Sequence, residues 1–393
     1  KPVRLLGEDL VLFKDEEGRY GLVERHCCHR GADLAFGRLE DGGLRCPFHG
    51  WLFDVAGACL AQPGEPEGSN FHRKVRQPAY PCVERNGIVF AYMGPLAEGE
   101  APPAVPGFDC FAAPDAYTFA FKGLWECNWL QAMEVGIDPA HASFLHRFFE
   151  DGEDEEYGQQ FRGKTQEVAV TKVLREHESP ELEVEETDYG LRIAALRRME
   201  GEAMHIRVTN AVFPHGAIIP MSSDINITQW HVPIDDVSCY WYAMFTDYSR
   251  TVDKVTMREQ RIHSVTLPDY RPVKNKANNY GFDAEEQKSS TYTGMGMDIN
   301  VHDQWAVESL GPIQDRTREH LGYTDKAITA YRRRLFRGIE AVERGEDPPM
   351  VLRNGASVEE APISIDTIGA APQWQEDWRA HEDARREASP WAE

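Results

Sequence analysis

Two short loops that each carry a cysteine and a histidine constrain the fold of this chain more than any other feature. The first loop reads Arg25-His26-Cys27-Cys28-His29-Arg30-Gly31, and the second reads Arg45-Cys46-Pro47-Phe48-His49-Gly50-Trp51. The spacing is C-x-H, then sixteen residues, then C-x-x-H, and a glycine follows each histidine within two residues. Each loop lies at a turn between predicted strands, which places both pairs to share one metal centre.

Two thiolates on one iron and two imidazoles on a second iron are the ligands of a Rieske-type [2Fe–2S] centre. In this interpretation Cys27 and Cys46 bind one iron, whereas His29 and His49 bind the other. The main alternative is a zinc site with two cysteines and two histidines. Such zinc sites usually pair like with like, whereas each loop here supplies one ligand of each type. Cys28 has no cysteine opposite it in the second loop, and we expect a free, buried thiol.

The composition excludes several classes of function. Acidic residues outnumber basic ones by 65 to 42, a formal net charge of −23, which argues against nucleic-acid binding because phosphates require a clustered positive field. No apolar run approaches the roughly 20 residues that span a bilayer, so we expect no membrane segment. No charged-then-apolar leader opens the chain, and eight cysteines are ordinary usage for 393 residues. We therefore expect a cytoplasmic protein with reduced thiols.

The distribution of strands, turns and prolines divides the chain into four parts. Residues 1–95 contain short strands and tight turns such as Asn86-Gly87, and predict a small all-β Rieske domain. A proline-rich linker follows at residues 96–115. Residues 116–345 mix strands with helices and predict an α+β catalytic domain with a non-haem iron, and residues 346–393 predict an acidic C-terminal extension.

The predicted elements after the linker can be given as ranges. Strands are expected at residues 167–174, 191–196, 203–212, 225–232 and 239–246. Helices are expected at residues 139–149, 253–265, from near Asp303 onward, at 326–342 and, within the extension, at 373–387.

A second group of candidate metal ligands consists of Asp138, His141 and His146. Histidines five residues apart do not share one face of a regular helix, because five steps turn about 140°. A locally irregular helix would let both imidazoles reach one metal. With a distant carboxylate they would form the two-histidine, one-carboxylate site of non-haem Fe(II) enzymes. Asp138 precedes Pro139, so it suits a helix N-cap, and its carboxylate also suits a hydrogen bond to the His141 imidazole.

With these motifs in hand, the chain resembles the terminal oxygenase component of Rieske non-haem iron aromatic-ring-hydroxylating oxygenases, in the phthalate dioxygenase-like branch. The motifs are Cys27-x-His29 with Cys46-x-x-His49, then Glu134-x3-Asp138-x2-His141-x4-His146, then Val301–Glu308 running into Gly311–Gly322. The resemblance implies that Asp303 is the third iron ligand. Asp298 is the fallback, since family members often carry an acidic residue where this chain has His302. The charged block 315–322 is expected to form a solvated or salt-bridged helix surface.

The resemblance also implies an architecture. A Rieske domain, which normally begins before Lys1, precedes a helix-grip (START-like) domain with a twisted antiparallel sheet and flanking helices. Three chains form a homotrimer, or two such rings a dimer of trimers, in which the cluster of one subunit faces the iron of its neighbour. Asp138 would then be a catalytic residue that contacts His141 of its own chain and His49 of the adjacent chain.

The activity implied by the resemblance is that of a terminal oxygenase with a Rieske [2Fe–2S] cluster and a mononuclear Fe(II). It would use O2 and electrons from a separate NAD(P)H-dependent reductase, of the flavin and ferredoxin type, to hydroxylate or dihydroxylate an aromatic carboxylate such as a phthalate- or phenoxybenzoate-type compound. The alternative is a Rieske aryl-ether O-demethylase or monooxygenase. An electron carrier and a metal-stabilised sensor of small aromatics are further hypotheses, but the presence of all three iron ligands favours the oxygenase.

An aromatic acid requires a local cation, because the overall charge of −23 would repel it. Arg207 is the candidate clamp, through its bidentate fork, and an exposed strand arginine is the alternative. By the resemblance Asn210 falls at a pocket position, and Gln229 and His231 are further lining candidates, although His231 equally suits a buried core histidine. Arg207 and Asn210 have opposite strand parity, so a regular strand cannot direct both side chains inward.

Overall fold

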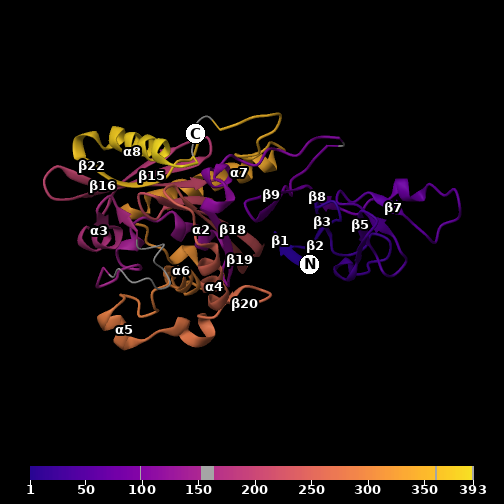
Figure 1. Cartoon of the computed structure of the whole chain (residues 1–393), viewed down its shortest axis with the longest axis horizontal. Coiled ribbons are helices and arrows are strands. Elements are labelled where there is room, and N and C mark those ends of the chain that lie inside the picture. The colour runs from indigo at the N-terminus through magenta and orange to yellow at the C-terminus, as the bar shows by residue number, and fades with distance from the viewer. Residues whose placement is uncertain (98, 152–162, 359–360, 392–393) are drawn as a thin grey trace. The chain divides into compact units, whose positions relative to one another are not determined.

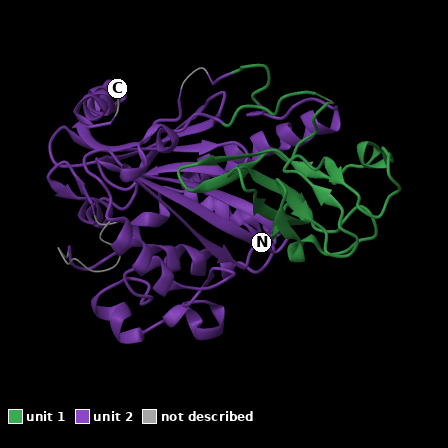
Figure 2. Cartoon of the chain, turned by 45° about the vertical axis from the view of Figure 1, so that its right-hand side comes forward, with its two compact units in different colours: residues 1–105, 352–356 green, residues 106–351, 357–393 purple. Residues whose placement is uncertain are grey.

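The computed structural model describes residues 1–97, 99–151, 163–358 and 361–391 (Figure 1). The chain divides into two compact units (Figure 2). The first contains residues 1–105 and 352–356, and the second contains residues 106–351 and 357–393. Among the described helices, none combines the length and the apolar character needed to cross a membrane.

The first unit is all-β, as predicted. It contains two four-stranded antiparallel sheets and a hairpin. One sheet runs β1(Pro2–Leu5), β2(Glu8–Lys14), β3(Tyr20–Glu24), β8(Ala79–Tyr80), and the other runs β4(Arg38–Glu40), β5(Gly43–Arg45), β6(Leu52–Phe53), β7(Cys59–Ala61). The hairpin joins β9(Cys82–Arg85) to β10(Ile88–Ala91), and short 3-10 turns lie at Leu34–Phe36 and Phe71–Lys74.

The turn predicted at Asn86-Gly87 lies between β9 and β10, where both residues have positive φ angles of 45° and 90°. These angles are the ones that a two-residue hairpin turn with right-handed twist demands. The core of this unit combines Val11, Val23 and Phe53 with Cys27 and Cys46. The two loop cysteines are therefore part of the hydrophobic core.

The second unit is built on one eight-stranded antiparallel sheet, which confirms the α+β prediction. Seven strands follow the order β11-β19-β18-β17-β16-β15-β14, and β22 pairs with the free part of β16. Their bounds are β11(Thr118–Trp125), β14(Glu181–Glu186), β15(Gly190–Arg198), β16(Ala203–Val212), β17(Gly216–Pro220), β18(Ile225–Asp235), β19(Ser238–Asp247) and β22(Ile365–Ala370). Four of the five predicted strands, those from residue 191 onward, are confirmed.

Helices cover the sheet. The described ones are α1(Asp109–Ala112), α2(Trp129–Gly136), α3(Val170–Glu176), α4(Lys254–Ser264), α5(Ala284–Ser289), α6(Ile299–Glu308), α7(Lys326–Glu343) and α8(Trp374–Ala388). The predictions at 253–265, 326–342 and 373–387 are confirmed by α4, α7 and α8, and the helix expected near Asp303 begins four residues earlier. Minor elements lie at Asp115–Tyr117, His141–Ser143, Lys164–Thr165, Val168–Ala169, Val265–Thr266, Arg271–Pro272, Lys276–Gly281, Arg316–Arg318, Tyr323–Asp325 and Ala371–Gln373.

Two predicted elements are wrong. The helix expected at 139–149 is a single 3-10 turn, His141–Ser143. The Asp138 carboxylate accepts a hydrogen bond from Ala140 N at 2.8 Å, which is the cap geometry, but no α-helix follows it. The strand expected at 167–174 is mostly helix α3, in which Val170, Val173 and Leu174 face the core. The β-branched residues of this segment suggested a strand, but its buried positions are spaced three and four residues apart, as in a helix.

The helix α2, which leads into the predicted iron ligands, is held from two sides. Met133 and Ile137, at α2 and its C-terminal cap, are fully buried against Ile193 and Ala211 of the sheet and against Tyr331 of α7. In Figure 1, α2 and α6 lie over the strands β18 and β19. The sheet thus fixes the point at which the chain leaves α2 and enters the loop containing Asp138.

Most of the residues predicted as a C-terminal extension, 346–351 and 357–393, belong to the second unit, whereas residues 352–356 belong to the first. Strand β22 pairs with β16, and α8 places the fully buried Trp378 against Leu196, Met204 and Ile365. The acidic and proline-rich composition of residues 346–393 concealed one strand, β22, whereas the helix expected at 373–387 is α8. This correction matters for function, because β22 lies beneath the candidate iron site.

Candidate metal centres and pocket

The two cysteine–histidine loops have the same backbone geometry. Gly31 N donates to Cys27 O at 2.8 Å, and Gly50 N donates to Cys46 O at 2.9 Å. Both glycines have positive φ angles, 76° and 75°, which a residue with a Cβ adopts only at a cost. The loops begin in register as well, since Cys27 N and Cys46 N each donate 2.8 Å bonds, to Ala32 O and Trp51 O. The equal spacing in the sequence therefore produces two matched loops.

The four side chains separate into a sulfur pair and an imidazole pair. Cys27 and Cys46 are each 2% exposed, whereas His29 and His49 are half-buried with ring centroids 4.5 Å apart. Trp51 stacks on His29 at 4.2 Å and holds that ring in place. This arrangement supplies two thiolates to an inner metal and two imidazoles to an outer one, as a Rieske cluster requires.

The chemistry of the donors also suits a bound cluster. Burial raises the pKa of Cys27 to about 12, so a thiolate at neutral pH requires a cation beside the sulfur. His49 Nδ1 is buried and has no hydrogen-bond partner among the described residues. A buried ring nitrogen without a partner is costly unless it binds a metal. The residues present therefore fit a [2Fe–2S] cluster.

Cys28 differs from the prediction. It is exposed, not buried. Its backbone N–H is held instead by Gln77, whose Oε1 accepts at 2.8 Å. The Gln77 amide also donates to Glu24 O and His26 O, both at 2.9 Å. Gln77 is fully buried and fixes the first loop, a role that no sequence motif indicated.

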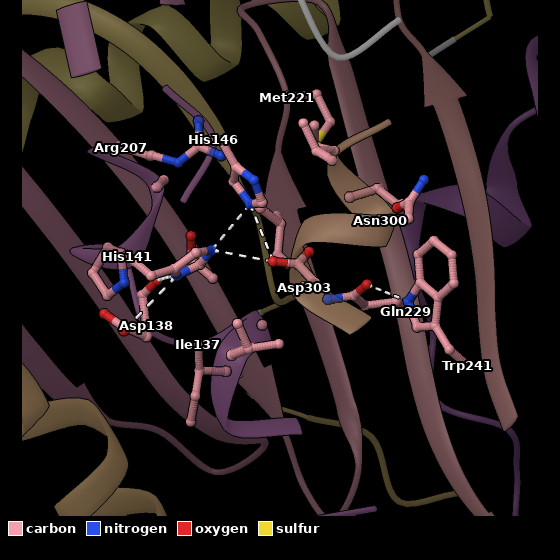
Figure 3. A pocket seen from close by; sticks show the side chains of 18 residues that line it. Ile137, Asp138, His141, His146, Arg207, Met221, Gln229, Trp241, Asn300 and Asp303 are labelled. Atoms are coloured by element: carbon pink, nitrogen blue, oxygen red, sulfur yellow. Dashed lines mark hydrogen bonds and ion pairs between the residues drawn. The ribbon is translucent and has the colours of Figure 1, made fainter. Parts of the chain in front are cut away.

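The three predicted iron ligands converge at one end of a pocket (Figure 3). His141 and His146 lie in the loop after α2, and Asp303 lies in α6. His146 Nε2 is 3.2 Å from Asp303 Oδ1, His141 Nε2 is 3.7 Å from the same oxygen, and the two Nε2 atoms are 3.2 Å apart. All three can offer one ligand atom within 4.8 Å of the others. The irregular loop thus achieves what a regular helix could not.

The electrostatics of this cluster suit a divalent cation. Burial lowers the pKa of His146 to about 3 and also lowers that of His141, so both imidazoles are neutral and can bind metal. Burial raises the pKa of Asp303 to about 6, and its Oδ1 accepts no hydrogen bond within the described structure. A carboxylate oxygen facing two neutral imidazoles is the donor set that non-haem Fe(II) uses.

The fallback ligand Asp298 has a different role. Its side chain caps α6 by accepting from Asn300 N at 3.1 Å. His302, in place of the acidic residue frequent in the family, is fully buried and stacks on His146 with a centroid distance of 5.7 Å. The α6 helix therefore places Asp303, not Asp298, beside the two predicted histidine ligands.

Asp138 meets its two predicted roles only in part. One carboxylate oxygen accepts from Ala140 N, as in a helix cap. The other, Oδ2, lies 3.8 Å from His141 Nδ1, and the same ring nitrogen contacts the Asp138 carbonyl oxygen. The 3.8 Å separation is too long for a hydrogen bond, so the backbone carbonyl of Asp138, and not its carboxylate, contacts the ring of the predicted iron ligand His141.

Eighteen residues line the pocket, and two of the four predicted substrate residues are among them, Arg207 and Gln229. Asn210 and His231 are not. Asn210 is fully buried with its amide bonded to Ile363 O and Ser364 Oγ, so its prediction as a pocket residue is wrong. His231 lies beyond the pocket against Trp125, as a core histidine. The parity argument is confirmed, since Arg207 and Thr209 face the pocket and Asn210 does not.

The pocket walls are mainly apolar. They come from α2 and its C-terminal loop, from β17 and the turn after it, from β18 and β19, and from the start of α6: Val135, Gly136, Ile137, Pro139, Ala142, Ile219, Met221, Ile227, Trp241 and Ile299. The polar lining away from the metal ligands is Asp138, Arg207, Thr209, Gln229 and Asn300. Trp241 Nε1 donates to Gln229 Oε1 and so fixes that amide.

Sequence reasoning missed two buried charges next to this pocket. Asp366 of β22 is fully buried and pairs with Arg207, with Oδ2 and Nη1 2.7 Å apart. Arg197 of β15 is 1% exposed and donates to Pro139 O at 2.9 Å, to Ser143 Oγ at 3.5 Å and to His177 O at 3.0 Å. Both residues lie in strands whose charged positions would ordinarily be assigned to the surface.

The charged block after α6 is salt-bridged, as predicted, but it is not a solvated helix. Arg316 and Arg332 both contact the buried Glu134 of α2, with N–O distances of 2.9 and 2.6 Å. Arg332 also pairs with Glu319 at 2.6 Å. The network ties α7 and the segment after α6 to the helix that leads into the iron ligands. These salt bridges give Glu134, the first residue of the second motif, a structural role.

Comparison with known proteins identifies both units. The Rieske [2Fe-2S] domain family matches residues 1–81, and the family described as "LigXa C-terminal domain like" matches residues 91–393. The phthalate 4,5-dioxygenase oxygenase subunit of Pseudomonas putida is 34% identical over 96% of this chain and 84% of its own length. The 5,5'-dehydrodivanillate O-demethylase oxygenase subunit of Sphingobium sp. (strain NBRC 103272 / SYK-6) is 33% identical over 92% of this chain and 77% of its own length.

A third relative and two solved structures agree with this result. The phenoxybenzoate dioxygenase subunit alpha of Ectopseudomonas oleovorans is 33% identical over 90% of this chain and 80% of its own length. Dicamba monooxygenase bound to dicamba superimposes with a TM-score of 0.56 at 18% identity, over 88% of this chain and 94% of that one. NdmA of Pseudomonas putida CBB5 with caffeine superimposes with a TM-score of 0.57 at 17% identity, over 90% of this chain and 89% of that one. The structures show the shared fold alone.

The fold, the two donor sets and the matched families lead to one assignment. The chain belongs to the Rieske non-haem iron oxygenases, as an oxygenase component of the phthalate dioxygenase-like branch with a Rieske [2Fe–2S] cluster and a mononuclear iron as cofactors.

Proposed function

We propose that this oxygenase hydroxylates a small aromatic carboxylate, and that the pocket around Asp303 is where it does so. The observation that carries the proposal is the polarity of that pocket. Two neutral histidines and a carboxylate lie at one end, apolar side chains line the walls, and Arg207 is the only lysine or arginine among the described lining residues. Such a pocket suits an aromatic ring with an acidic group.

The metal ligands follow from the same geometry. His141, His146 and Asp303 hold the iron, and Cys27, Cys46, His29 and His49 hold the cluster. When bound, these centres supply the electrons and the open coordination positions that O2 activation requires. The protein binds the substrate ring between Met221, Ile227 and Trp241, which also exclude water, and Arg207 orients it through the carboxylate.

Asp138 is proposed to link the two centres of neighbouring subunits. Its Oδ2 lies beside His141, and about a quarter of its side chain is exposed, 23%. This leaves the carboxylate accessible to His49 of an adjacent copy. The corresponding assembly is a homotrimer, or a dimer of trimers. Electrons would come from a separate reductase of the flavin and ferredoxin type.

O-demethylation is the second candidate activity. One relative at 33% identity is named as an O-demethylase oxygenase subunit. The same ligand set serves both reactions, and the position of the substrate above the iron decides between ring hydroxylation and attack on a methoxy carbon. None of the eight cysteines forms a disulfide, which supports a reducing, cytoplasmic location.

Oxygen uptake with a surrogate reductase tests the proposal. The holoenzyme is assayed with a panel of benzoates, phthalates, phenoxybenzoates and methoxybenzoates, and product masses are measured under 18O2. Substrate-dependent uptake with 18O in an aromatic acid product is expected. Formaldehyde release from methoxybenzoates would identify the demethylase instead. Uptake that no aromatic acid stimulates would contradict the proposal.

A further inference from the structure

A cluster of four buried side chains lies on the face of the sheet beneath the iron site. It consists of Arg197 on β15, His205 and Arg207 on β16, and Asp366 on β22. The strands pair so that Arg197 lies opposite His205 and Arg207 lies opposite Asp366. Asp366 and His205 are 0% exposed, Arg197 is 1% and Arg207 is 8%. We refer to these four residues as the pocket floor.

Asp366 is the centre of this cluster. Its Oδ2 accepts from Arg207 Nη1 at 2.7 Å, and its Oδ1 lies 2.8 Å from His205 Nε2 and also accepts from the Thr165 hydroxyl. Arg207 has no other hydrogen-bond partner in the described structure, so its remaining N–H groups are available to the pocket that it lines. Figure 3 places its side chain beside His146.

The charges of the pocket floor sum to one positive unit. Two arginines contribute +2 and Asp366 contributes −1. Burial lowers the pKa of His205, so this ring is neutral at neutral pH in spite of its acidic neighbour. Arg197 makes its bonds to two backbone carbonyls and a hydroxyl, and no carboxylate among the described residues forms an ion pair with it. One negative charge therefore neutralises the pocket floor, and a second would be in excess.

We propose that Asp366 is a positioning residue that holds Arg207 and lowers the net charge of the pocket floor from two positive units to one, so that the pocket selects aromatic compounds with a single carboxylate over dicarboxylates. The inference rests on the proposed function, since it concerns the acid bound at Arg207. It separates this chain from a relative whose name specifies phthalate, a dicarboxylate. The pocket lining offers no second cation for another carboxylate, among the residues that the structure describes.

Monomethyl phthalate and phthalate test the charge dependence, because they are nearly isosteric and differ by one negative charge. Dissociation constants are measured by calorimetry on the holoenzyme at about pH 7.5, where all carboxyls are ionised. The wild type should bind the monoester at least about tenfold more tightly than the diacid, as expected for one unmatched charge in partly buried surroundings. Equal affinity, tighter binding of phthalate, or no binding of either acid would overturn the proposal.

Asp366→Asn tests the role of the residue itself. The amide keeps the size and removes the charge, so the pocket floor carries two positive units and the preference should shift toward phthalate by about ten- to a hundredfold. Asp377→Asn is the matched control, because Asp377 holds the same strand through Ala370 N and does not contact Arg207. Equal selectivity shifts in both variants, or none in Asp366→Asn, would reject the positioning role.

Two further results keep the test decisive. If Asp366→Asn does not fold, Asp366→Glu retains the charge and displaces the carboxylate, and it should weaken binding of the monoester while the preference for it persists. Loss of that preference would contradict the proposal. Because binding is measured without turnover, absence of oxygenation with aromatic acids would count against the proposed function, and a preference for the diacid would count against this inference alone.

Discussion

Arg197 provides a sharp prediction, because its bonds hold the loop that carries the iron ligands. The guanidinium donates to Pro139 O and Ser143 Oγ within that loop and to His177 O outside it. We expect Arg197→Met to lose the mononuclear iron while the protein remains folded and keeps its cluster. Methionine has a similar length but no donors, so both loop contacts are removed.

The magnitude follows from two opposing effects. Each hydrogen bond from a charged donor contributes about 1.5–3 kcal/mol, so the bonds to the two carbonyls together contribute about 3–6 kcal/mol. Burial, however, lowers the pKa of Arg197 from 12.5 to about 10, which corresponds to a cost of about 3 kcal/mol for keeping the cation in the folded state. Methionine relieves that cost, so the free energy of unfolding should fall by only about 0–3 kcal/mol. The hydrogen bonds from Arg197 to Pro139 O and Ser143 Oγ are lost in full. The affinity of the site for iron should therefore fall about tenfold to a hundredfold.

The assay uses the cluster as an internal reference. Iron and acid-labile sulfide are measured on the purified protein after gel filtration in the presence of a weak chelator. The wild type should contain three irons for two sulfides, and Arg197→Met two irons for two sulfides with an unchanged cluster spectrum. Arg192→Met is the control, since Arg192 lies in the same strand, is 4% exposed and pairs with Glu185 instead. A ratio that stays at three to two, or loss of both centres together, would refute the reasoning.

Three other variants address the site and the core. Asp138→Asn should keep both metal centres and lower product formation at least about a hundredfold, since the bridging carboxylate charge is lost; unchanged turnover would remove the bridge. Arg207→Gln should weaken binding of benzoates about tenfold or more and of neutral benzamides little; equal losses would reject the clamp. Burial lowers the pKa of His231 to about 3, so the unfolded chain binds a proton below about pH 6.5 that the folded one does not, and unfolding free energy should drop as pH falls. His231→Phe should remove about 2 kcal/mol of the drop between about pH 7 and 5 in urea titrations; an unaltered drop would contradict the assignment of a neutral core histidine.

The predicted cluster ligands rest on spacing within the sequence, whereas Asp303 was predicted from the family resemblance. A cysteine and a histidine in each of two glycine-ended loops allow few centres besides a Rieske cluster, and the matched loop geometry is a local property. The same holds for the parity of β16, where the period of two decides that Arg207 faces the pocket and Asn210 does not. Local rules therefore sufficed wherever a residue's role depends on its near neighbours in the sequence.

The predictions that failed concern residues whose roles depend on partners far away in the sequence. The pattern at 139–149 suggested a helix, but the imidazoles of His141 and His146 must meet Asp303, which is far away in the chain, and the backbone follows the loop that allows this. Arg197 and Asp366 carry charges that a strand normally exposes, and only their partners on other strands explain their burial. Long-range partners cannot be read from the spacing of one segment.

The position of Asp366 explains why the C-terminal segment matters to a site whose ligands end at Asp303. Strand β22 reaches β16 only because β17 is short and pairs with residues 210–212 alone, which leaves residues 203–208 free for β22. The Trp378 side chain then closes this edge from α8. A carboxylate on β22 therefore adjusts the charge of the pocket without disturbing the strands that carry its walls. Substitutions at this one position can alter acid selectivity while the iron ligands stay fixed.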